Sequence, residues 1–198
     1  MKKLILFVML ITMPIAAMAQ DAPYTADSEI QTEQNWQYYI SANIGAIASD
    51  VKIKDDSFFD FGGVTNFEIG AQYNRYRLAL AYQDRAEVSE LIQILAGHTV
   101  SLENKALRVN GYYDYVSSKS FAMYVGLGLG IDRYDYTIEE RYSGRKESKH
   151  GPAFTGGVST GMIFSFWHLG IDLGFAVDYV SYPRMYSFGP TIGLRYNF

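Results

Sequence analysis

From Trp36 to the C-terminus, apolar side chains recur at every second position of the chain. This period is typical of β-strands that have one face in an apolar environment and the other in a polar one. The alternation predicts an all-β fold with eight strands. They span residues 36–46, 65–73, 76–83, 106–115, 121–132, 154–164, 169–179 and 187–198.

The connections between these segments alternate between tight and long. The second and third segments are separated only by Asn74-Arg75, and the turns after the fourth and sixth segments are similarly short. Residues 47–63, 84–104 and 133–151 are expected to form long loops, and residues 181–186 a modest one. Because short turns on one side and long loops on the other are typical of membrane barrels, we expect a closed, eight-stranded antiparallel transmembrane β-barrel with periplasmic termini.

Charged residues are absent from the apolar faces and present on the polar faces. The expected lumen charges are Glu68, Arg77, Arg108, Asp114, Asp132, Asp172, Asp178 and Arg195. Aromatic residues also gather at the turn ends of the strands, as in an interfacial girdle. Both features favour a membrane barrel over a soluble, ligand-binding one. A structural ion network in the lumen is the preferred interpretation, and a proton or ion pathway is the alternative.

One pair of lumen charges is predicted specifically. If the outward residues Tyr179 and Phe188 lie opposite each other, Asp172 and Arg195 also face each other across the last two strands. Directly opposed side chains on one face are close enough for an ion pair. Small residues such as Gly126, Gly128 and Gly157 are expected to face large side chains across the lumen. The alternative is that these glycines leave a narrow water path.

The N-terminus has the pattern of a secretory signal peptide. Lys2 and Lys3 precede a short apolar run, and Ala17-Met18-Ala19 matches the cleavage site, so residues 1–19 are expected to be removed. Residues 20–35 are polar and are expected to form a flexible periplasmic segment. The barrel then spans residues 36–198.

The last strand carries a motif that resembles the signal read by the outer-membrane assembly machinery. Thr191, Gly193, Tyr196 and Phe198 occupy its polar, glycine and two aromatic positions. With the signal peptide and eight strands, the chain resembles the small outer-membrane barrels that include opacity proteins, neisserial surface protein A, OmpX/Ail-like proteins and the OmpA barrel. Glycine-rich residues 124–130 and the ending Gly-Leu-Arg-Tyr-Asn-Phe are most similar to the opacity-like "porin family" branch. The resemblance implies the fold and an outer-membrane location, but no single function.

Composition excludes several function classes. The chain has no cysteine, and its net charge of −4 becomes −6 without the two lysines of the signal peptide, so nucleic acid is not an expected partner. The three histidines, His98, His150 and His168, are expected in separate loops and turns. We therefore expect no catalytic residues, no metal site and no cofactor.

The loops are the remaining candidates for function, because rigid scaffolds commonly present binding residues there. The candidate contact residues are Lys52, Lys54, Phe58, Phe59, Arg141, Arg145, Lys146 and Lys149. The third loop is expected to be a solvated hairpin extension, although its basic residues could pair with lipopolysaccharide phosphates. Membrane lipid, lipopolysaccharide, the assembly machinery and a host or envelope protein are the expected partners. Two functions stay open: a surface protein in adhesion or host interaction, and a structural envelope protein or narrow channel.

Overall fold

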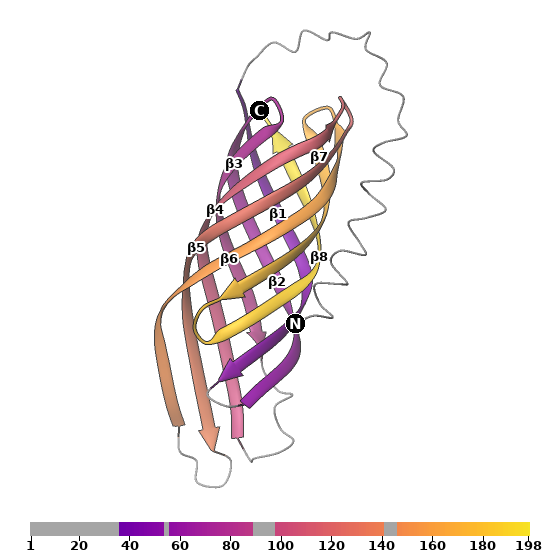
Figure 1. Ribbon diagram of the computed structural model, residues 1–198. Helices are drawn as coiled ribbons and strands as arrows, with labels where there is room; N and C mark the ends of the chain where they lie inside the picture. The colour runs from indigo at the N-terminus through magenta and orange to yellow at the C-terminus, as the bar shows by residue number, and fades with distance from the viewer. Residues whose placement is uncertain (1–35, 54–55, 89–97, 141–145) are drawn as a thin grey trace. The chain divides into compact units, whose positions relative to one another are not determined.

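The computed structural model describes residues 36–53, 56–88, 98–140 and 146–198, which form one closed barrel of eight antiparallel strands (Figure 1). Each strand pairs with the next in the chain, and β1 closes the barrel against β8. The expected signal peptide and N-terminal segment lie outside the described residues. The strands are β1 Gln37–Ile53, β2 Asp56–Tyr73, β3 Tyr76–Val88, β4 His98–Ser117, β5 Phe121–Glu140, β6 Lys146–Phe166, β7 Leu169–Val180 and β8 Arg184–Asn197.

Three tight turns and the C-terminus lie at one end of the barrel, at the top of Figure 1, and we call this the turn end. Tyr73 pairs with Tyr76 across a two-residue turn in which Asn74 has a φ of 54°. Asparagine tolerates this left-handed conformation better than most residues, and it favours tight hairpins. The turns after β4 and β6 are also short, so the predicted turns are confirmed.

The opposite end, which we call the hairpin end, differs from the prediction. Most of residues 47–63, 84–104 and 133–151 were expected to be loops, but the strands continue through them. The β1–β2 pairing reaches Ile53–Asp56, and the β5–β6 pairing reaches Glu139–Lys146. The alternation disappears there because outward side chains need not be apolar beyond the membrane, whereas backbone pairing persists. The expected extension of the third hairpin is confirmed.

A belt of exposed apolar side chains surrounds the barrel. Leu127, Ile69 and Leu194 are each about three-fifths exposed on its outer surface. Aromatic rings pair around the turn end. The ring centres of Trp36 and Tyr73 are 5.1 Å apart, and neighbouring strands carry similar pairs. This arrangement matches a lipid-facing belt with an interfacial girdle. Among the described residues, no helix has the length and apolar character needed to cross a membrane.

The register of the last hairpin corrects the specific ion-pair prediction. Tyr179 pairs with Tyr186 rather than Phe188, and Asp172 therefore lies opposite Gly193. Arg195 lies opposite Gly170. The predicted Asp172–Arg195 pair is wrong because the turn is shorter than assumed, which slips the strands by two residues and keeps every side chain on its predicted face.

Candidate functional site: the lumen and the hairpin end

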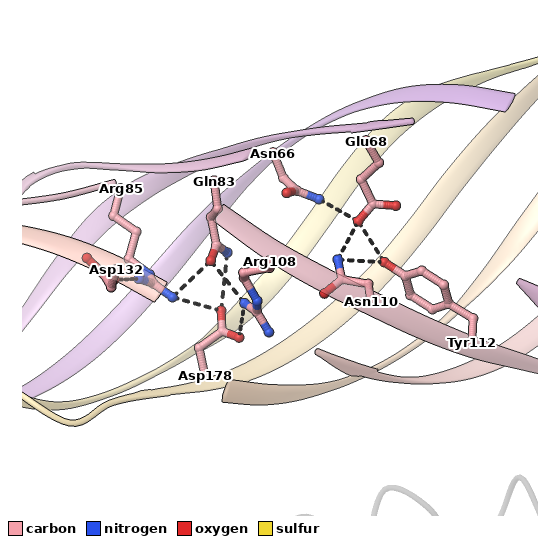
Figure 2. A network of polar contacts seen from close by, with 9 residues as sticks. All are labelled: Asn66, Glu68, Gln83, Arg85, Arg108, Asn110, Tyr112, Asp132 and Asp178. Carbon is pink, nitrogen blue, oxygen red and sulfur yellow. Dashed lines mark hydrogen bonds and ion pairs between the residues drawn. The ribbon is translucent and has the colours of Figure 1, made fainter. Parts of the chain in front are cut away.

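An ion-pair layer crosses the lumen towards the hairpin end (Figure 2). Arg108 on β4 lies 2.6 Å from Asp178 on β7, and Arg85 on β3 lies 2.9 Å from Asp132 on β5 and 3.3 Å from Asp178. The Gln83 side-chain carbonyl accepts hydrogen bonds from both guanidinium groups, and its amide donates to Asp178. All five side chains are buried, so the layer ties four strands together by charge-assisted bonds.

A second polar cluster is centred on Glu68 of β2. One carboxylate oxygen accepts hydrogen bonds from the Asn66 and Asn110 amides at 2.9 and 2.8 Å, and from the Tyr112 hydroxyl at 2.7 Å (Figure 2). No arginine lies within ion-pair distance of Glu68 among the described residues. The three donors offset much of the cost of removing this carboxylate from water.

Closer to the turn end, Arg77 forms the third cluster. Its guanidinium lies 2.7 Å from Asp114 and 4.6 Å from the ring centres of both Tyr112 and Tyr124. The Tyr124 hydroxyl donates a hydrogen bond of 2.9 Å to Asp172. Cation–π contacts and charge-assisted bonds together hold this cluster.

Arg195 makes no ion pair within the described part of the chain. Its guanidinium donates 2.7 Å hydrogen bonds to the side-chain oxygens of Gln72 and Asn197, and it lies 3.8 Å from the centre of the Tyr39 ring. Neutral amides and an aromatic face therefore replace the carboxylate partner that was predicted.

Glycines on β5 and β6 make room for the long side chains of the network. A Cβ atom at Gly128 would collide with Arg108 and Asn110, and one at Gly157 would collide with Asp178. Small and large residues do complement each other, mainly between adjacent strands, and a Cβ atom at Gly157 would also meet the Arg108 guanidinium from two strands away. A cavity of about 80 Å³ remains, and Glu68, Tyr124, Ser159 and Arg195 are among its lining residues.

The structure places all eight predicted lumen charges inside the barrel, seven of them buried and Asp172 half-buried. Arg85 belongs to the same network but was not predicted. It falls in a stretch expected to be a loop, where outward Asp84 and inward Arg85 are both charged and no alternation is visible. The polar partners Gln83, Asn110 and Tyr112 were on the predicted lumen face, but the polarity of a side chain does not indicate which residue it contacts.

The predicted loop contacts are placed only in part. Lys52 is exposed on β1, opposite Arg184 of β8. Phe58 and Phe59 lie on β2, and the Phe59 ring is 5.3 Å from that of Phe61 in an edge-to-face arrangement. Two further candidates, Lys146 and Lys149, are exposed on β6. The remaining candidates, Lys54, Arg141 and Arg145, lie outside the described residues.

The described part of the chain offers no arrangement suited to metal binding. Within residues 36–53, 56–88, 98–140 and 146–198, no three His, Cys, Asp or Glu side chains are grouped so that they could hold a metal ion. His168 instead joins the turn after β6 to the end of β8, since its Nδ1 lies 2.9 Å from the Asn197 carbonyl oxygen.

A closed antiparallel barrel with an apolar belt, an aromatic girdle and a charged interior defines a transmembrane β-barrel of the outer membrane. The chain belongs to the family described as the outer membrane protein beta-barrel domain, whose model matches residues 5–198. Its location is therefore the outer membrane. None of the curated protein sequences is a match.

Three solved structures share the fold. Neisserial surface protein A is 17% identical, with a TM-score of 0.62 over 81% of this chain and 97% of that one. A major outer membrane protein from Thermus thermophilus is 10% identical, with a TM-score of 0.59 over 83% and 100% of the two chains. Ail of Yersinia pestis, solved with the heparin analogue sucrose octasulfate, is 14% identical, with a TM-score of 0.53 over 81% and 99%.

Proposed function

We propose that this protein presents its hairpin end outside the cell as an interaction surface, with the turn end and both termini in the periplasm. The observation that carries the proposal is the extension of paired strands beyond the apolar belt. From Ile131, the last outward apolar residue of β5 before outward Arg133, about 30 Å of strand continues to Glu140. Strand this long beyond the belt is not needed to cross the membrane.

Charge and aromatic side chains on the hairpins support a binding role. Lys52, Arg133 and Arg184 are exposed beyond the belt, and Phe59 and Phe61 form an exposed aromatic pair beside β1. Exposed cations suit sulfated or phosphorylated ligands, and aromatic residues suit protein contact. The sulfated sugar analogue bound by Ail suggests a probe of the first kind. We propose adhesion to such a host or envelope ligand, without enzymatic activity.

The binding proposal predicts a specific loss of function. Asp135 pairs with His150, so the β5–β6 hairpin can be shortened by joining these residues through an Asn-Gly turn. We expect refolded wild-type protein to bind immobilised heparin or matrix protein, and we expect the shortened variant to bind it less tightly, because it lacks the exposed Lys146 and Lys149. Lys119→Gln, in the turn after β4, is the matched control and should bind normally. Full binding by the shortened variant would exclude this hairpin as the contact surface.

The proposed assembly signal gives a second prediction. Phe198 extends the last strand, because its backbone N–H donates to the Tyr38 carbonyl at 2.9 Å, and its ring lies 5.1 Å from that of Tyr196. Removing both aromatic rings (Tyr196→Ala with Phe198 deleted) should impair insertion into the outer membrane, measured by fractionation and heat-modifiable migration on gels. Tyr76→Ala removes an exposed ring from the same girdle and should assemble. Normal insertion of the first variant would count against the signal.

A further inference from the structure

Apolar side chains gather in the lumen at the hairpin end, although lumen-facing positions elsewhere are mainly polar. Val51, Leu102, Ala153, Val180 and Met185 pack together there, and each is at most 7% exposed. They come from five strands, namely β1, β4, β6, β7 and β8. Tyr134 of β5 packs against the group and lies 5.0 Å from the ring of Tyr182. We call the five residues the apolar plug.

Directly beside the plug, the lumen is lined by polar side-chain atoms that have no hydrogen-bond partner among the described residues. The Asn104 side-chain oxygen and the Thr155 and Ser187 hydroxyls find no hydrogen-bond partner among the described residues, yet these residues are at most 2% exposed. The Asn104 amide nitrogen is 4.0 Å from the Met185 sulfur, so the polar region meets the plug without an intervening layer. Buried polar groups of this kind are ordinarily satisfied by water.

The cavity extends this polar region away from the plug. Ser187 and Asp178 line its side nearest the plug, and its volume of about 80 Å³ has room for a few water molecules. Arg108 and Glu68 also line it. Water can therefore solvate both the ion-pair layer and the Glu68 cluster, whereas the plug offers it no polar atom except a thioether sulfur.

We propose that the apolar plug, and not the ion-pair layer, is the permeability barrier of this barrel, acting as a hydrophobic gate over a water-holding lumen. Apolar constrictions exclude ions because they do not wet, and an ion loses its hydration there without gaining a partner. The ion-pair layer instead supplies charges and hydrogen bonds that attract water. This barrier role goes beyond the proposed surface function and is independent of any ligand.

Conductance in planar bilayers tests the proposal. The refolded full chain should give no discrete current steps, and the variant Val51→Ser/Met185→Ser should give them. Gln83→Ala loosens the ion-pair layer without removing a charge and should remain silent. Met185→Ala is a milder variant with the same expected direction. Heat-modifiable migration on gels shows that each variant is folded before it is measured.

A cysteine probe locates the current path. The chain has no cysteine, so Ser187→Cys introduces a single thiol next to the plug. Silver ions should block the current of the plug variant that carries Ser187→Cys and should not block it without this cysteine. The proposal would be overturned if folded plug variants carried no current, or if the wild-type protein gave discrete current steps. Current steps in Gln83→Ala together with no current in the plug variant would also overturn it. So would a plug-variant current that silver does not block when Ser187→Cys is present.

Discussion

Replacing Asp178 with asparagine is expected to lower the free energy of unfolding of the barrel by about 3–5 kcal/mol. Asp178 contacts both Arg108 and Arg85, at 2.6 and 3.3 Å, and all three side chains are at most 8% exposed. The substitution keeps the volume but leaves two buried guanidinium groups with one carboxylate, that of Asp132. The loss therefore comes from uncompensated charge rather than from a cavity.

Urea unfolding of the protein in phospholipid vesicles measures this effect, and Trp36 and Trp167 provide the fluorescence signal. Glu103→Gln is the matched control, because Glu103 and Lys105 form an ion pair of 3.3 Å in which both side chains are about half exposed. That change should cost less than about 1 kcal/mol. If the two variants are equally stable, the buried layer does not hold the barrel together.

Replacing Leu127 with arginine is expected to cost about 2–4 kcal/mol of barrel stability, because the side chain lies in the middle of the lipid-facing belt. Leu127 is 58% exposed on the outer surface, and Leu80, Val125 and Leu173 lie on the same belt. An arginine there must reach the interface or thin the bilayer. The same unfolding experiment measures the loss at each position.

Ser148→Arg is the control for this series, since Ser148 is exposed on the hairpin end and its hydroxyl forms a hydrogen bond with that of half-buried Thr137. It should change stability little. Equal tolerance of arginine at Leu127 and at Ser148 would mean that the belt is not in contact with lipid.

Alternation predicted the strands well where lipid lies on one side and the lumen on the other. Within the belt, the assignment of faces holds for every strand but one, and the Asn74-Arg75 turn is placed to the residue. The exception is β4, where the pairing with β5 shifts between Asp114 and Val116 and the alternation breaks at Tyr115. A bulge adds one residue without changing the composition of the strand, so the pattern does not reveal it.

Beyond the belt, the sequence no longer distinguishes strand from loop. Arg85 and Asn104 are paired across β3 and β4, but both lie in a stretch whose outward residues are also polar. The plug was missed for the same reason, because Val51, Leu102 and Met185 fall in stretches that were expected to be loops, where no lumen face was assigned. Register is similarly hidden, since a two-residue slip leaves the pattern unchanged and only the turn length decides it.

The central claim is that the hairpin end lies outside the cell and the turn end lies in the periplasm, and single-cysteine labelling of intact cells tests it most directly. The chain has no cysteine of its own, so Ser148→Cys marks the hairpin end and Lys119→Cys the turn end. A maleimide that cannot cross the outer membrane should label Ser148→Cys in intact cells, and Lys119→Cys only after the outer membrane is permeabilised. Labelling of Lys119→Cys in intact cells, with Ser148→Cys protected, would contradict the account.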